Sequence, residues 1–73
     1  MVVYGRDNCP ACKNVKTFLN ALKVDYEYKD TQNTPGAREE LHSFGFKSVP
    51  LIVEGNKMLV GFNPAELQEL INH

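Results

Sequence analysis

The sequence predicts one α/β domain over residues 1–73, with a four-stranded mixed sheet flanked by three helices. Short β-branched and aromatic runs alternate with stretches in which apolar residues recur every three to four positions, as strands and amphipathic helices do. Hydrophobic residues make up 42% of the chain and charged residues 23%, which is ordinary for a globular protein. A chain of 73 residues has room for a single core.

The first half of the chain predicts a parallel strand–helix–strand unit. MVVYG, residues 1–5, is a short β-rich run that ends at a glycine. An amphipathic helix is expected from Pro10, because apolar residues follow at positions 15, 18, 19 and 22. VDYEYKD, residues 24–30, alternates apolar and charged side chains like a half-buried strand. A crossover helix between two strands of one sheet makes them parallel.

The second half predicts a helix, a hairpin and a last helix. One helix is expected between the polar loop TQNTPG and Gly45. The strands PLIVE and KMLVGF flank Gly55-Asn56, which is a two-residue hairpin signal, and add an antiparallel pair to the sheet. The apolar positions that predict the two helices are Ala37, Leu41 and Phe44 for the first, and Leu67, Leu70 and Ile71 for the second.

Charge and hydropathy exclude several classes of partner. The net charge is −1 and the eight basic residues are scattered, so neither nucleic acid nor an anionic membrane is an expected partner. The start of the chain lacks the basic and apolar regions of a signal peptide, and no apolar run approaches transmembrane length. We therefore expect a cytoplasmic protein, and we also expect it to be a monomer.

The two cysteines of the chain lie in one short stretch, DNCPACKNVK. A bridge between Cys9 and Cys12 would close a very short loop, and short loops stabilise a fold least. A chemically reactive pair is therefore the better interpretation than a structural staple.

Three of the four prolines directly precede a helical pattern, where the missing N–H of proline costs nothing. The residues before these prolines are expected as N-caps: Cys9, Thr34 and Asn63. Glu66 follows Asn63 at the spacing of a capping box. The first helix is thus capped by a thiol.

A thiolate at a helix N-terminus meets free backbone N–H groups and the positive end of the helix dipole. Both favour the charged form, and thiols in such places have pKa values from ~3.5 to ~7.5, against ~8.5 for a free thiol. Cys12 lies one turn further on the same face, where it can attack a mixed disulfide on Cys9. Arg6 and Lys13 are placed to add positive charge nearby, with plain solvation as the alternative for each.

Metal binding is the main alternative for a C-x-x-C pair. Structural zinc needs four ligands, and the remaining candidates here are His42 and His73. An iron–sulfur cluster shared between two chains also stays open, since each chain would supply cysteines. A third alternative is an interaction domain whose dithiol is inert.

Several segments together resemble the glutaredoxin family of the thioredoxin fold (βαβαββα). VYGRDNCPAC is similar to its strand-to-helix opening with a redox C-P-x-C pair, and SVP to its T-V-P segment. GFKSVPLIVEG and VGFNPAEL are closer to the NrdH-type redoxins of that family. The resemblance covers essentially the whole chain.

The resemblance implies a role for each matching residue. Cys9 would be the nucleophile and Cys12 the resolving thiol. Pro50 would follow a cis peptide bond, and the backbone of Val49 would pair with an extended substrate or with glutathione. Arg6 stands where glutaredoxins often carry a lysine that meets a glutathione carboxylate.

The chain departs from each group of the family at different positions, and it also lacks the C-(M/V)-Q-C usual in NrdH redoxins. Ala11 replaces the tyrosine of C-P-Y-C, and G-G-x-D becomes VGFN, which keeps Gly61 but has Asn63 in place of the acid. The tryptophan usual in NrdH redoxins is absent, and Leu59 stands in its place. An apolar rim around Cys9 is expected from Ala11, Val49 and Phe62, with a place in the core as the alternative for Phe62.

The resemblance therefore implies a dithiol–disulfide oxidoreductase that carries electrons to a disulfide-bearing enzyme such as ribonucleotide reductase. Thioredoxin reductase or glutathione would be the electron donor, and the missing acid favours the reductase. No metal or organic cofactor is expected, because the dithiol itself stores two electrons.

Overall fold

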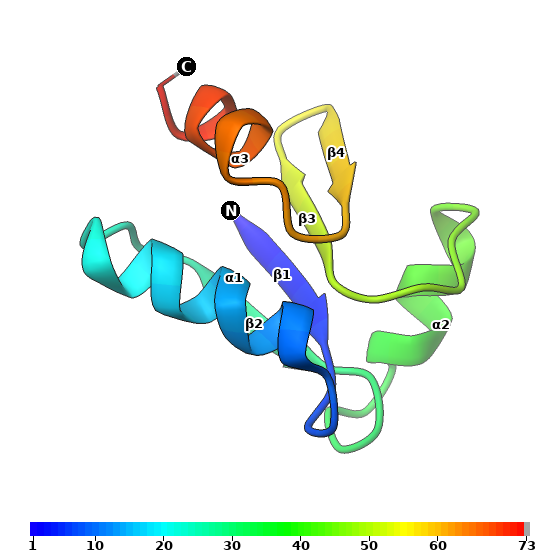
Figure 1. The fold of residues 1–73 in the computed structure, drawn as a ribbon. Helices are drawn as coiled ribbons and strands as arrows, with labels where there is room; N and C mark the ends of the chain where they lie inside the picture. Colours follow the sequence, from blue (N-terminus) through cyan, green and yellow to red (C-terminus); the bar gives the residue numbers. More distant parts are fainter. Residues whose placement is uncertain (73) are drawn as a thin grey trace.

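A computed structural model describes residues 1–72, and the fold is the expected one (Figure 1). The elements in chain order are β1 (Val2–Gly5), α1 (Pro10–Ala21), β2 (Glu27–Asp30), α2 (Ala37–Ser43), β3 (Leu51–Glu54), β4 (Lys57–Val60) and α3 (Pro64–Ile71).

The four strands form one mixed sheet in the order β2-β1-β3-β4. β1 and β2 are parallel, with Val2 opposite Glu27. β3 is antiparallel to both β1 and β4, and the tight turn between β3 and β4 has Gly55 at φ 61°. The parallel pair and the hairpin were both expected from the sequence, and both are confirmed.

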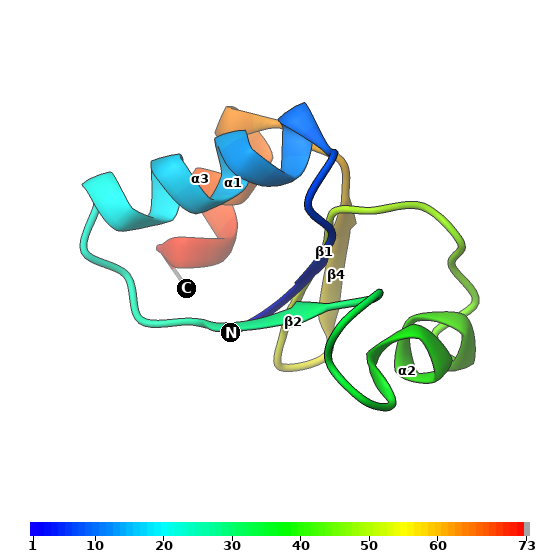
Figure 2. The same ribbon diagram turned by 90° about the horizontal axis from the view of Figure 1, so that it is seen from below.

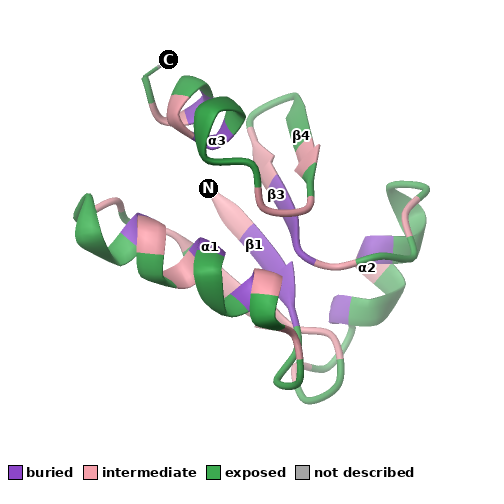
Figure 3. Cartoon of the chain, in the orientation of Figure 1, coloured by how far each residue is buried: buried purple, intermediate pink, exposed green. Residues whose placement is uncertain are grey.

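The helices cover the sheet unequally. α1 and α3 lie on one face, and the short α2 lies on the other, towards the end of the sheet where β1 stops (Figures 1 and 2). Buried residues follow the central strands β1 and β3 (Figure 3). The core on the α1/α3 face consists of Val3, Val15, Leu19, Ile52, Leu67 and Leu70. The core on the α2 face consists of Tyr4, Ala37, Leu41 and Leu51.

The helix expected at Pro35 begins two residues later, so the prediction of Thr34 as its N-cap is wrong. Gly36, at φ 82°, is the N-cap and offers no side-chain hydrogen bond. The Thr34 hydroxyl instead accepts from the backbone N–H of Asp30 at 3.0 Å. Thr34 therefore closes the turn after β2, and a side-chain acceptor committed to that turn is not available to a helix.

Other elements are shorter than the sequence predicts. β2 begins at Glu27, although Val24 and Tyr26 still pack against the core on the α1/α3 face. α1 ends at Ala21, and Leu22 of the expected apolar stripe is its exposed C-cap. β4 ends at Val60 because the chain turns at the next residue.

Candidate functional site

Cys9 is the N-cap of α1, as the sequence predicts. Its backbone is extended, with φ −136° and ψ 101°, and Pro10 opens the helix. The Sγ atom of Cys9 accepts a hydrogen bond from the backbone N–H of Cys12 at 3.1 Å. One sulfur atom is thus held against the free N–H groups at the positive end of a twelve-residue helix.

The two cysteines are joined in a disulfide, with their Cα atoms 5.2 Å apart. Their accessibility differs. Cys12 is only 1% exposed, whereas Cys9 is half-buried. A partner sulfur can therefore reach Cys9 from solvent but not Cys12.

The Val49–Pro50 peptide bond is cis, as the resemblance implies. Pro50 is buried, and its carbonyl oxygen accepts from the N–H of Gly61 at 2.9 Å. Gly61 has φ 85°, in the left-handed region that favours glycine. Two of the residues that the sequence singled out, Pro50 and Gly61, are thus in direct contact.

Phe62 and Asn63 both make contacts that stabilise the fold. The Phe62 ring packs edge-on against Phe18 with centroids 6.1 Å apart, next to the core on the α1/α3 face. The Asn63 side-chain oxygen accepts from the N–H of Glu66 at 3.2 Å and caps α3. The predicted cap is confirmed, and this acceptor is engaged within the chain.

Arg6 and Val49 line one hollow of about 1130 Å³, which we call the α2 groove. It lies between the loop that follows β1, the loop that leads into α2, α2 itself and the segment before Pro50. Its charged lining residues are Arg6, Arg38, Glu39 and Lys47, and His42 also lines it. The groove therefore carries a net positive charge, although the whole chain carries −1. Cys9, Ala11, Gly61 and Phe62 do not line it.

Sequence reasoning missed the contribution of Arg38 and Lys47 to this groove. Lys47 lies two residues before Val49, and this proximity was the one available signal. Arg38 carried no signal, because its place in the groove depends on where α2 lies against the sheet.

Tyr28 is a second residue that sequence reasoning missed. A side chain at Gly5, the last residue of β1, would collide with the Tyr28 ring and hydroxyl. The ring also lies beneath Lys16 of α1, with Nζ 4.4 Å from the ring centroid. Burial raises the pKa of Tyr28, with smaller contributions from Asp30 and Asp7. The ring therefore packs between β1 and the dithiol helix, and neutral tyrosine is favoured there.

Metal ligation was the open alternative for the cysteine pair. Within residues 1–72 no group of three or more His, Cys, Asp or Glu side chains is placed to hold a metal ion. His42 lines the α2 groove, and His73 lies outside the described residues. Among the described helices, none is long and apolar enough to cross a membrane.

Known proteins match both the sequence and the fold. The glutaredoxin family model matches residues 1–59. A glutaredoxin-like 8.6 kDa protein of Clostridium pasteurianum, encoded in a rubredoxin operon, is 37% identical over 71 residues, which covers 94% of this chain and 93% of that protein. The glutaredoxin-like protein NrdH of Lactococcus lactis subsp. lactis is 30% identical over 70 residues, with 96% and 97% covered.

A solved structure agrees with these relatives. The glutaredoxin-like NrdH-redoxin of Escherichia coli superposes with a TM-score of 0.85 at 28% identity, covering 94% of this chain and 91% of that one. The family model, the matched length of the relatives and the fold therefore agree with a cysteine pair whose first member caps a helix. The chain belongs to the glutaredoxin family of thiol–disulfide oxidoreductases, as a glutaredoxin-like redoxin of the NrdH kind.

Proposed function

We propose that this redoxin reduces the disulfide of a partner enzyme, with Cys9 as nucleophile and Cys12 as resolving thiol. The observation that carries this assignment is the asymmetry of the pair. Cys9 is accessible and accepts from a helix N-terminal N–H group, whereas Cys12 is 1% exposed. The N-terminal position favours the thiolate, which is the attacking form of a cysteine.

The proposed reaction has two exchanges. The Cys9 thiolate attacks one sulfur of the partner disulfide, whose S–S bond breaks and leaves a partner thiolate that takes up a proton. Cys12 then loses its proton and attacks Cys9 Sγ, which expels the second partner thiolate and forms the Cys9–Cys12 disulfide. Two electrons pass to the partner, and the donor restores the dithiol by the reverse exchange.

Val49 and Pro50 are proposed to receive the partner chain. An extended segment that reaches Cys9 needs backbone partners, and short strand-like pairing is a common way to supply them. The cis bond at Pro50 and the place of Val49 and Arg6 in one groove support this role. Ala11 and Gly61 would contact the same segment from α1 and from the turn after β4.

The proposed electron donor is a thioredoxin reductase with NADPH. Glutathione carries a free amino group; the Asn63 amide has no carboxylate to offer it, and the Asn63 side-chain oxygen already caps α3. The half-buried Phe62 and Ala11 leave apolar surface for a protein donor. The related Escherichia coli redoxin has been described as having a thioredoxin-like activity profile. Ribonucleotide reductase is the proposed acceptor, by the likeness to NrdH redoxins.

Insulin reduction with two donor systems tests the proposal. NADPH with thioredoxin reductase should drive turnover faster than millimolar glutathione with glutathione reductase. Cys9→Ser should abolish turnover, and Cys12→Ser should trap a mixed disulfide with insulin. Turnover by Cys9→Ser would contradict the assignment of the nucleophile, and glutathione-driven turnover without a reductase-driven rate would overturn the choice of donor.

A further inference from the structure

α2 contributes only two buried residues to the core on its face of the sheet. It has seven residues, of which Ala37 and Leu41 are the buried ones. Its N-cap Gly36 makes no side-chain hydrogen bond. Isolated helices of this length are unstable in water, so tertiary contacts must fix its position.

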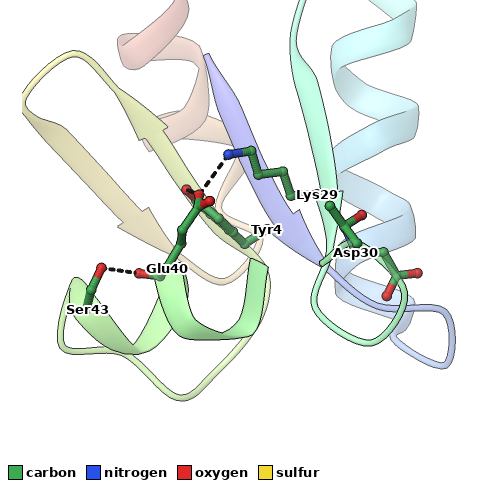
Figure 4. Close-up of polar contacts among 6 residues, drawn as sticks. Tyr4, Lys29, Asp30, Glu40 and Ser43 are labelled. Carbon is green, nitrogen blue, oxygen red and sulfur yellow. Dashed lines mark hydrogen bonds and ion pairs between the residues drawn. The ribbon is translucent and has the colours of Figure 1, made fainter. Parts of the chain in front are cut away.

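Glu40 supplies a polar contact between α2 and two strands. Its Oε1 atom accepts from the Tyr4 hydroxyl of β1 at 2.7 Å and from Lys29 Nζ of β2 at 2.7 Å (Figure 4). Tyr4 is 3% exposed, and Lys29 Nζ lies 5.8 Å from the centroid of its ring. Three elements, β1, β2 and α2, therefore meet at one carboxylate oxygen.

The electrostatics agree with this geometry. Hydrogen bonds from Lys29 and then Tyr4 hold the pKa of Glu40 below its ordinary value. The hydrogen bond to Glu40 raises the pKa of Lys29. Burial, followed by the bond to Glu40, raises the pKa of Tyr4. Near neutral pH, Glu40 is therefore favoured as a carboxylate, Lys29 as an ammonium and Tyr4 as a neutral phenol. The carboxylate accepts hydrogen bonds from the other two groups.

The same helix forms one wall of the α2 groove. Arg38, Leu41 and His42 line the groove, and Glu40 lies between them in sequence. Arg38 and His42 are exposed and one helical turn apart, so they share a face. Because a short helix moves as one unit, any change in the tilt of α2 at Glu40 also moves Arg38 and His42 relative to Arg6 and the loop between β1 and α1.

We propose that Glu40 is a positioning residue for partner binding. Its hydrogen bonds fix α2 against β1 and β2, and thereby position the α2 side of the α2 groove, which would receive a polypeptide beside Cys9. Glu40 touches neither sulfur atom, so the chemistry of the dithiol does not depend on it. This inference rests on the proposed function, because it assigns Glu40 to the binding of that same partner.

The experiment compares two oxidants of the reduced protein. Insulin is a polypeptide, which the proposal places in the groove, whereas hydroxyethyl disulfide is small and neutral and needs no surface beyond the two cysteines. Single-turnover oxidation is followed by quenching, alkylation and mass spectrometry at several oxidant concentrations. For Glu40→Leu we expect a roughly five- to tenfold lower second-order rate constant with insulin, because insulin binds more weakly and half-saturates the rate at a higher concentration. With hydroxyethyl disulfide the rate constant should stay within about twofold of wild type.

Matched variants separate positioning from folding. Glu40→Gln keeps an acceptor oxygen and should recover most of the insulin rate. Lys29→Met removes one donor from the solvent-accessible side and tests the same contact if Glu40→Leu fails to fold. Glu69→Gln removes an exposed carboxylate from α3, and should match wild type with both oxidants.

Each outcome has one meaning. Selective loss with insulin and rescue by Glu40→Gln support the proposal. An equal loss with both oxidants, or no loss with either for folded Glu40→Leu and Lys29→Met, overturns it. A wild-type protein that reduces neither oxidant would instead overturn the proposed function.

Discussion

The sulfur of Cys9 and the backbone N–H of Cys12 lie 3.1 Å apart, so the accessible cysteine caps the helix that contains its buried partner. This one contact makes the two thiols chemically unequal. The helix N-terminus lowers the pKa of a thiol placed at the cap, and burial protects the other thiol from reagents in solvent. The order of the two exchange steps follows from this inequality.

Alkylation should reveal that inequality directly. In the reduced protein, limiting iodoacetamide at neutral pH should modify Cys9 roughly tenfold or more faster than Cys12. Peptide mass spectrometry gives the ratio. In urea the two sites should react at similar rates, which is the control. Equal modification in the folded protein would contradict the capping argument.

Asn63→Asp should shift the choice of electron donor towards glutathione. Aspartate caps a helix as well as asparagine does, so α3 should remain stable, while its carboxylate gains a charged partner in the glutathione amino group. A charge-assisted hydrogen bond of ~1.5–3 kcal/mol corresponds to a roughly ten- to hundredfold gain in glutathione-driven turnover. The reductase-driven rate should change little.

Asn63→Ala is the matched control for that substitution. It removes the cap and should lower the free energy of unfolding by about 1 kcal/mol, without any gain in glutathione-driven turnover. An unchanged glutathione rate in Asn63→Asp would show that the amino group of glutathione lies elsewhere.

The contact of Glu40 with Tyr4 and Lys29 should make stability depend on pH in two windows. The pKa of Glu40 is depressed from 4.5, so its contribution is present above that value and is lost as pH falls through the lower folded pKa. The pKa values of Lys29 and Tyr4 are raised from 10.5 and 10.0, so their contributions are lost as pH rises beyond those values.

Urea unfolding of wild type and Glu40→Gln across pH measures this dependence. The difference in free energy of unfolding between the two proteins should be level from about pH 5 to pH 9. It should shrink towards zero in acid, where the wild-type carboxylate becomes protonated. A difference that stays constant down to pH 2 would rule out the charged contact.

Gly5 and Tyr28 should be coupled in stability. Gly5→Ala places a methyl group against the Tyr28 ring, and such overpacking costs ~1–3 kcal/mol of unfolding free energy. In a Tyr28→Val background the ring is absent and the same substitution should cost much less. Chemical denaturation of the four proteins in the cycle gives the coupling energy. Additive effects would mean that the ring does not occupy the space beside Gly5.

Local features of the sequence determined much of this protein. Cys9 before Pro10 and Asn63 before Pro64 each define a helix start, because capping involves only residues within one turn. The strand order along the chain and the hairpin at Gly55 follow from periodicity and turn chemistry, which are also local. The cis bond at Pro50 was predicted from the family resemblance, since the residues around it do not dictate it.

Tertiary structure alone decided the features that depend on contacts between distant segments. Thr34 is a residue type that often caps helices, but its hydroxyl accepts a hydrogen bond from the backbone N–H of Asp30. α2 therefore begins later, at Ala37, with Gly36 as its N-cap. The contact of Glu40 with two strands joins residues up to 36 positions apart. Hydrophobic periodicity does not predict this contact, because a single glutamate on a helix gives no sign of which hydrogen-bond donors the fold will bring to it.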